Sequence, residues 1–195
     1  MRKLTYFIAC SIDGFIGDPK GDGSSTYAYV TGEFLEYLKA EYPETIAAHA
    51  WPVLGIEAGT PNRHYDTVLQ GLNSYRVGLD VGITSPYAHL RELVATRSLA
   101  ESPDPHVELI ADDLVGRIRE LKAEDGPLDI WLCGGSTIAG ELIDEIDELV
   151  IKTYPQVFGA GMPMFGTDFA PRDFALGDVR SFDNGVLVRT YTRKR

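Results

Sequence analysis

A pair of adjacent glycines stands where a phosphate could be bound. Residues 128–137 read LDIWLCGGST, an apolar run followed by Gly134-Gly135 and then by the hydroxyl side chains of Ser136 and Thr137. The apolar run is typical of a strand covered on both faces. The glycines remove two Cβ atoms at the turn, and either hydroxyl can cap a following helix whose free N–H groups favour an anion. The pattern predicts a phosphate-binding turn, with a tight turn that binds no ligand as the alternative.

Composition limits which partners such a turn could serve. The chain has 195 residues and a formal net charge of −11, which argues against nucleic acid as a main partner because phosphate neutralisation needs a basic surface. A phosphate-bearing ligand must therefore be met by locally placed arginines. No apolar run is long enough to span a membrane, and the N-terminal residues are typical of a first strand rather than a signal peptide, so we expect a cytoplasmic protein.

Two further groups of residues have simple interpretations. Cys10 and Cys133 are too few and too far apart for a zinc motif, and we expect buried, reduced thiols. The last three residues, Arg193-Lys194-Arg195, are expected to form a solvated, frayed end.

The elements that must position these residues alternate between strands and helices. Runs of apolar and β-branched residues predict strands over 4–10, 65–71, 93–96, 107–110, 128–133 and 148–153. Apolar positions at helical spacing predict helices over 31–42, 112–125 and 136–143, with Thr31 and Asp112 as caps, and another short helix opening at Asn73-Ser74-Tyr75. The loop over 18–25 is rich in Gly, Asp and Ser and could act as a lid.

The C-terminal part predicts a hairpin. Residues 174–192 are strand-like on either side of Asp183-Asn184-Gly185, and Asn-Gly favours a tight turn. Strands separated by helices and followed by a hairpin imply an α/β fold whose sheet is mostly parallel, with an antiparallel edge. No repeat or linker divides the chain, so we expect one domain over 1–195.

Several motifs together resemble a known family. These are SIDGFIG, VLQGLNSY, VATRSL, DIWLCGGSTIAGELI, IDELVI and PQVFGAGMPMF, whose order and spacing are similar to those of the dihydrofolate reductase-like superfamily. The branch they resemble most includes the reductase domain of the bifunctional riboflavin-biosynthesis enzyme. The resemblance covers nearly the whole chain except residues 43–64, which have no counterpart. It implies a three-layer fold with helices on both faces of the sheet, NADPH as cofactor and a homodimer.

The resemblance also implies which residues hold NADPH. Gly134 and Gly135 would lie against the pyrophosphate, often with a cis peptide, and Arg97 would meet the 2′-phosphate that distinguishes NADPH from NADH. The alternative for Arg97 is an ordinary surface arginine. The full set of implied cofactor residues is Ala9, Ile16, Gly71, Ser74, Tyr75, Thr96, Arg97, Ser98, Gly134, Gly135, Ser136 and Thr137.

One position departs from the family pattern. Relatives commonly carry an arginine after the glycine that ends the second long strand, and this chain has Leu72 there. Losing an ion pair with phosphate could weaken cofactor binding by orders of magnitude. Arg76 or Arg63 could compensate from nearby.

Reduction of a C=N or C=O bond needs a proton as well as a hydride. The acidic candidates are Asp13 after the first strand, and Glu33 or Glu36 on the next helix. Asp13 before Gly14 is also a common turn residue, and Glu33 suits a helix N-terminus.

The sequence therefore predicts an NADPH-dependent reductase of a small polar heterocycle or sugar-derived substrate. It would be similar to 5-amino-6-(5-phosphoribosylamino)uracil reductase. The alternative is a non-catalytic ligand-binding protein in which Leu72 marks lost cofactor affinity.

Overall fold

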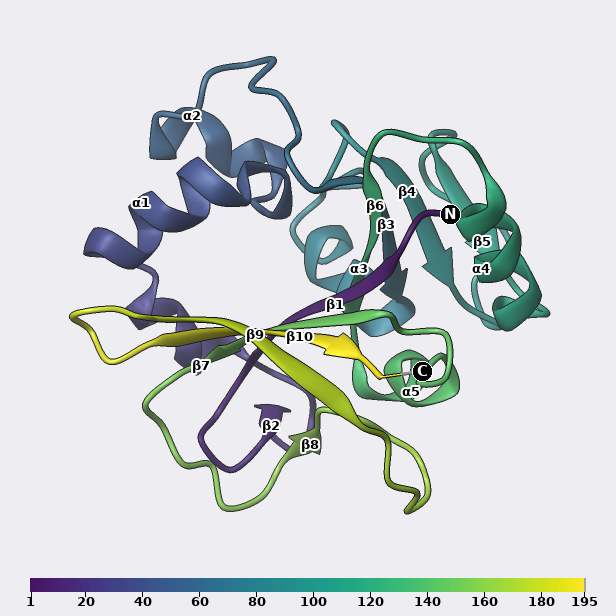
Figure 1. Cartoon of the computed structure of the whole chain (residues 1–195). Coiled ribbons are helices and arrows are strands. Elements are labelled where there is room, and N and C mark those ends of the chain that lie inside the picture. Colours follow the sequence, from purple (N-terminus) through teal and green to yellow (C-terminus); the bar gives the residue numbers. More distant parts are fainter. Residues whose placement is uncertain (195) are drawn as a thin grey trace.

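The central feature of the protein is an eight-stranded sheet of order β5-β4-β3-β6-β1-β7-β10-β9 (Figure 1). The computed structural model describes residues 1–194. The strands from β5 to β7 in that order are parallel, and the β9-β10 hairpin adds an antiparallel edge. The strands are β1 (Leu4–Cys10), β3 (Tyr65–Gly71), β4 (Arg91–Ala95), β5 (Val107–Ile110), β6 (Asp129–Gly134), β7 (Glu148–Thr153), β9 (Phe174–Ser181) and β10 (Leu187–Arg193). A small separate sheet pairs β2 (Phe15–Gly17) with β8 (Met162–Pro163).

Helices cover both faces of the sheet, as predicted. Alternate residues of each strand point to opposite faces, so Leu69 of β3 packs with α4 (Leu114–Ala123) and α5 (Ser136–Glu141), while Val68 packs on the side of α1 (Gly32–Glu41). Helix α3 (Leu72–Leu79) packs against Val94 of β4. The three-layer α/β expectation is confirmed. No helix within residues 1–194 combines the length and apolar character needed to cross a membrane.

Residues 43–64, for which the sequence analysis placed no counterpart, form a packed structure. They contain the 3-10 turns η2 (Pro43–Thr45) and η3 (Ala48–Ala50) and the short helix α2 (Trp51–Leu54). The buried Glu44 carboxylate accepts from the backbone N–H groups of His64 and Tyr65 at 2.7 and 3.0 Å, which joins this segment to the start of β3. A third 3-10 turn, η1 (Ser24–Tyr29), begins inside the segment predicted as a loop.

Three predictions about helix ends and the C-terminus need correction. The cap of α4 is Asp113, whose carboxylate accepts from Gly116 N, rather than Asp112. Helix α5 begins after Gly135 with no side-chain cap, so neither Ser136 nor Thr137 caps it. Arg193 is not frayed: it belongs to β10, its Nε donates to Ile146 O and its guanidinium lies over the Phe174 ring. Arg195 lies outside the described residues.

The thiols also differ from expectation. Neither cysteine forms a disulfide within the described residues. Cys10 is buried, as expected, but Cys133 is only partly buried.

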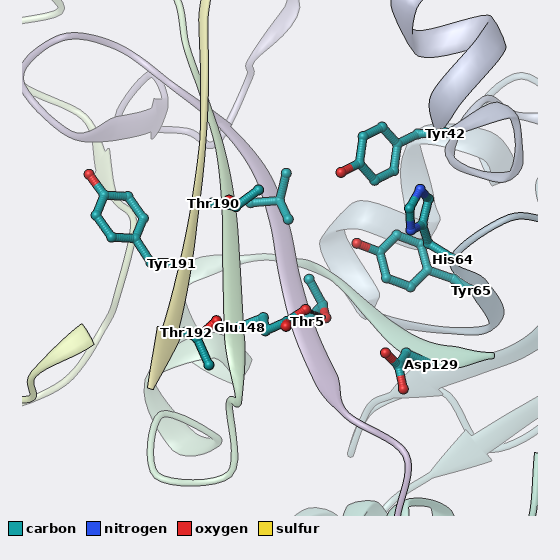
Figure 2. A pocket seen from close by; sticks show the side chains of 10 residues that line it. Thr5, Tyr42, His64, Tyr65, Asp129, Glu148, Thr190, Tyr191 and Thr192 are labelled. Carbon is teal, nitrogen blue, oxygen red and sulfur yellow. Dashed lines mark hydrogen bonds between the residues drawn. The ribbon is translucent and has the colours of Figure 1, made fainter. Parts of the chain in front are cut away.

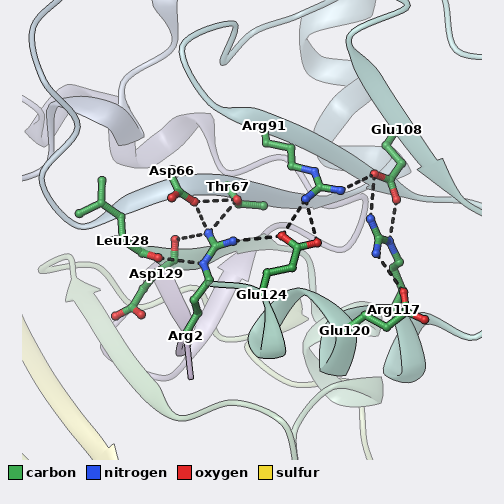
Figure 3. A network of polar contacts seen from close by, with 10 residues as sticks. All are labelled: Arg2, Asp66, Thr67, Arg91, Glu108, Arg117, Glu120, Glu124, Leu128 and Asp129. Carbon is green, nitrogen blue, oxygen red and sulfur yellow. Dashed lines mark hydrogen bonds and ion pairs between the residues drawn. The ribbon is translucent and has the colours of Figure 1, made fainter. Parts of the chain in front are cut away.

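Charged side chains tie the amino ends of the strands to α4 (Figure 3). The buried Arg2 pairs with Asp66, donates to Thr67 Oγ1 at 2.9 Å and lies 3.7 Å from Glu124 of the segment after α4. Glu124 also pairs with Arg91, and the chain of ion pairs continues through Glu108 to Arg117 of α4. The network therefore holds together the amino ends of the strands, on the opposite side of the sheet from their carboxyl ends.

Candidate functional site

A long groove of about 840 Å³ runs along the carboxyl edge of the parallel strands. Its walls include Gly71 at the end of β3, Ala95 at the end of β4, Ile110 at the end of β5 and Gly135 after β6. Ile8 and Cys133 point to opposite faces of the sheet, and both line the groove. The groove therefore extends over both faces at the carboxyl ends of the strands. Ligands of open α/β sheets bind outside the carboxyl ends of the strands, which makes this groove the candidate site.

The glycine pair forms the middle of the groove. The peptide bond between Gly134 and Gly135 is cis, and Gly134 has φ of +119°, a conformation that side-chain-bearing residues rarely adopt. Ser74 Oγ of α3 donates to the Gly134 carbonyl oxygen at 3.1 Å, which fixes the turn against that helix. A Cβ added to Gly71 would lie 3.4 Å from the same carbonyl oxygen. The three glycines therefore bring bare backbone together where a ligand can approach it.

The turn after β4 forms one end of the groove. The buried hydroxyl of Thr96 accepts from the backbone N–H groups of Ser98 and Leu99, each at 3.2 Å, so it holds the turn rather than facing a ligand. Arg97 is exposed and forms no ion pair with another described residue, which leaves its guanidinium available to an anion. Asp112 and Asp113 also line the groove. These two carboxylates repel an anion, so an anion bound there depends on the attraction of Arg97.

Helix α3 supplies a second cation. Leu72, at the position where the family resemblance implies arginine, packs partly buried against the core of α3 and β4. Arg76 lies four residues later on the same helix, hence on the same face, and lines the groove. Arg63 lies elsewhere, donating to Ala40 O at 2.6 Å and pairing with Glu41. Of the two arginines that could compensate for Leu72, the geometry therefore favours Arg76.

Most of the cofactor residues implied by the sequence line this groove. They are Ile16, Gly71, Ser74, Thr96, Arg97, Ser98, Gly135, Ser136 and Thr137, with Gly134 forming the turn itself. Ala9 points to the α1 side of β1 and packs against the core there, so the adjacent Ile8 forms the groove wall instead. Tyr75 is a correction: it is fully buried and its hydroxyl donates to Thr84 O at 2.5 Å.

The structure does not bring the predicted proton donors into the groove. The Asp13 carboxylate accepts from Ser11 Oγ at 2.6 Å, Phe158 N at 3.1 Å and Gly159 N at 2.8 Å. The hydrogen bond from Ser11, followed by those from the two backbone N–H groups, lowers the pKa of Asp13 to about 2. A carboxylate with this pKa is ionised at neutral pH, and its hydrogen bonds hold the turn after β1 outside the groove lining, so the geometry does not support the predicted role of Asp13 as the acid. Glu33 is exposed at the start of α1 and does not line the groove, and Glu36 pairs with Lys39.

Several groove residues were not among those predicted from the sequence. Tyr27 of η1 and Tyr87 before β4 come from segments with no regular pattern of their own, while Met162 of β8 belongs to the PQVFGAGMPMF motif. Lys20 and Gly21 of the predicted lid also line the groove. Cys133 belongs to the glycine motif, and its position one residue before the pair was a usable signal.

A second, smaller cavity of about 250 Å³ lies at the amino ends of the strands (Figure 2). Its lining includes Thr5 of β1, Tyr65 of β3, Asp129 of β6 and Glu148 of β7. Each of these residues stands at or near the start of its strand. The cavity is therefore at the edge opposite to the glycine turn and is not part of the candidate site.

Comparison with known proteins gives related chains of the same fold. The chain is 29% identical over 166 residues to the uncharacterized protein YwjB of Bacillus subtilis (strain 168), covering 84% of this chain and 83% of that one. A provisionally named riboflavin biosynthesis protein of Shewanella sp. PV-4 is 26% identical with a TM-score of 0.67, and all of each chain is covered. Dihydrofolate reductase of Enterococcus faecalis, solved with NADP(H), is 16% identical with a TM-score of 0.64, covering 99% of this chain and 97% of that one. The last likeness concerns the fold alone.

The family assignment rests on nearly the full length of the chain. The model of the RibD C-terminal domain family matches residues 2–188, which include every strand of the central sheet except β10 beyond Val188. The match also contains the whole lining of the groove. With its dihydrofolate reductase-like fold, the chain belongs to the RibD C-terminal domain family.

Proposed function

We propose that this protein is an NADPH-dependent reductase of a small polar heterocycle or a sugar-derived compound. The observation that carries the proposal is the continuity of the groove. The groove runs from the glycine turn after β6, past Arg76 of α3, to the turn after β4 that carries Arg97. This order suits a dinucleotide, whose two phosphates and terminal 2′-phosphate are separated along its length.

The residues present fit such a ligand. Lys20, Arg76 and Arg97 are the basic residues among the described residues that line the groove, and they offer charge to phosphates in a protein whose net charge is −11. A Cβ at Gly135 would lie 3.5 Å from Met162 Sδ, so any larger side chain would fill the space that the groove keeps open there. When bound, NADPH would supply the hydride. The chain's own groups would bind the phosphates, orient the substrate and supply the proton.

The alternative of a non-catalytic binding protein has one observation in its favour, namely Leu72 in place of the usual arginine. The presence of Arg76 on the same face of α3 weighs against it.

Titration with NADPH, followed by nicotinamide fluorescence, tests the proposal. We expect saturable binding that is tighter for NADPH than for NADH. An absence of binding to either nucleotide at millimolar concentration would contradict the reductase and favour the alternative.

A further inference from the structure

The smaller cavity, at the amino ends of the strands, is lined by polar and aromatic side chains (Figure 2). Its volume of about 250 Å³ lies below the roughly 300 to 1,000 Å³ of sites for drug-sized ligands, so it suits a smaller molecule. Thr5 of β1 lines it and shares a face of that strand with Phe7, which packs in the core on the α1 side. The cavity therefore opens on the α1 side of the sheet, at the edge away from the glycine turn.

One wall of this cavity is a stack of three rings. Tyr42 follows α1, and its ring centroid lies 4.5 Å from that of His64 and 6.3 Å from that of Tyr65, with interplanar angles of 26° and 22°. The buried Glu44 carboxylate accepts from the backbone N–H groups of His64 and Tyr65, which fixes the end of the segment 43–64 to its beginning. The aromatic wall is therefore built from residues at both ends of that segment and is held in place by the fold.

The two tyrosine hydroxyl groups point into the cavity. Tyr42 and Tyr65 are 6% and 3% exposed, and Figure 2 shows both hydroxyl groups directed toward the strands that carry Thr5 and Glu148. Tyr65 interacts there with Thr5, whereas Tyr42 interacts with Tyr37 of α1. A hydroxyl group offers one donor and two acceptor positions, so each of them keeps capacity for a further polar partner.

The charges around the cavity do not balance. Asp129 of β6 and Glu148 of β7 line it, and among the described residues no lysine or arginine does. Lys3 lies beside it: its Nζ pairs with Glu148 at 2.6 Å, and its backbone N–H donates to Asp129 Oδ1 at 2.8 Å. Asp129 itself forms no ion pair with another residue of the range 1–194. Two carboxylates thus share one lysine, and one negative charge remains without a counter-ion.

We propose that this cavity is a second binding site and that its ligand is a small protonated amine. An ammonium group beside Asp129 and Glu148 would supply the missing positive charge and donate to the carboxylates. The apolar part of the ligand would lie against the rings of Tyr42 and Tyr65, whose faces also attract a cation. An anion would be repelled by the two carboxylates, and a neutral molecule would leave the charge unbalanced.

Three probes that share one ring test the class of ligand. At pH 7 benzylamine is a cation, benzyl alcohol is neutral and benzoate is an anion. Each is titrated into the ¹⁵N-labelled protein, and the assigned amide signals in the NMR spectrum show where it binds. We expect benzylamine to bind about 10-fold more tightly than benzyl alcohol, with shifts at Thr5, Tyr65 and Glu148, and benzoate not to bind there. Failure of benzylamine to bind, equal affinities of the amine and the alcohol, or shifts confined to the groove would overturn the proposal.

Asp129→Asn tests the carboxylate that lacks an ion pair. The amide oxygen can still accept the bond from the Lys3 N–H group, so the fold should be retained, and the exposed Asp168→Asn is the control with the same change in net charge. We expect benzylamine to bind about 10-fold more weakly to Asp129→Asn and equally well to the control, with benzyl alcohol unaffected in both. No loss, or a similar loss for both probes, would contradict a role of the Asp129 charge.

Lys3→Met should have the opposite effect. The Lys3 side chain is half-exposed, and its removal leaves Glu148 free to pair with the ligand, so benzylamine should bind more tightly. Lys39→Met, which removes a lysine paired with Glu36 on α1, should leave the affinity unchanged. Weaker binding of benzylamine to Lys3→Met would contradict the proposal, and so would its displacement from the wild type by NADPH. Failure of the wild type to bind NADPH would concern the proposed function alone, because these titrations need no nucleotide.

Discussion

The Asp13 carboxylate accepts a hydrogen bond from Gly159 N at 2.8 Å, although the two residues are 146 positions apart. With the bond from Phe158 N, it joins the turn between β1 and β2 to the segment that leads from β7 to β8. Asp13 therefore stabilises the loops at one end of the groove.

This relationship predicts an acid-dependent effect of Asp13→Asn. Hydrogen bonds from Ser11 and the two backbone groups lower the pKa of Asp13 to about 2, below its ordinary 3.8. A carboxylate with a depressed pKa contributes stability above its unfolded-state value, and this contribution is lost as the pH falls through its folded-state value. We expect Asp13→Asn to lower the Tm at pH 7, with the difference from the wild type shrinking between pH 4 and pH 2. Thermal unfolding followed by circular dichroism measures this, and an equal difference at all pH values would contradict it.

Gly135→Val should abolish NADPH binding. A side chain at Gly135 would begin 3.5 Å from Met162 Sδ and extend into the groove at the glycine turn. Ala175→Val on the exposed strand β9 adds similar bulk away from the groove and serves as the control. Calorimetric titration should show no binding to Gly135→Val and normal binding to the control. Unchanged affinity of Gly135→Val would remove the turn from the cofactor site.

Arg97→Ala should reduce the preference for NADPH over NADH. The exposed guanidinium lines the groove without a partner ion, and a charge-assisted contact with the 2′-phosphate would contribute on the order of 1.5 to 3 kcal/mol. We expect this loss for NADPH and little change for NADH, measured by titration of both nucleotides. Equal losses would mean that Arg97 does not contact the 2′-phosphate.

Arg76→Ala should weaken the binding of NADPH and of NADH to the same extent. Arg76 follows Leu72 by one helical turn beside the glycine pair, where the pyrophosphate common to NADPH and NADH would lie. Leu72→Arg restores the residue that relatives carry and should tighten both nucleotides, most clearly in the Arg76→Ala background. If Arg76→Ala leaves both affinities unchanged, Arg76 does not replace the missing arginine.

Arg2→Met should destabilise the protein more than Arg117→Met. Arg2 is 7% exposed and bonds to the buried Thr67 and to the half-buried Asp66 and Leu128 O, so its removal costs these three bonds, roughly 2 to 4 kcal/mol in all. Arg117 pairs with Glu108 and Glu120 near the surface, where an ion pair is worth about 1 kcal/mol or less. Denaturant unfolding of both variants makes the comparison, and equal losses would contradict it.

The positions of the strands along the chain and the fold class were predictable because the information is local or carried by the family pattern. The predicted spans 4–10 and 65–71 coincide with β1 and β3, since apolar and β-branched residues mark both and Gly71 ends the second. The hairpin was also predictable from Asn184-Gly185, where Gly185 has φ of +84°.

The site predictions that the geometry does not support concern contacts between residues that are distant in the sequence. Asp13 was predicted as an acid. Its hydrogen bonds with Phe158 and Gly159 could not be seen in the sequence, because these partners lie near the other end of the chain. Tyr75 and Arg76 are neighbours on α3, and only the packing of the helix decides that the first is buried and the second lines the groove.

The position of β1 in the sheet has a consequence for synthesis on the ribosome. Its two neighbours are β6 and β7, so Leu4 pairs with Ile130 and Thr5 pairs with Glu148. Strand β1 is therefore synthesised well before either of its sheet partners, and more than 120 residues separate Leu4 from Ile130. Pairings of such long sequence separation form slowly and leave apolar surface open to aggregation meanwhile. We therefore expect β1 to remain unpaired, and open to aggregation, until β6 and β7 have left the ribosomal tunnel.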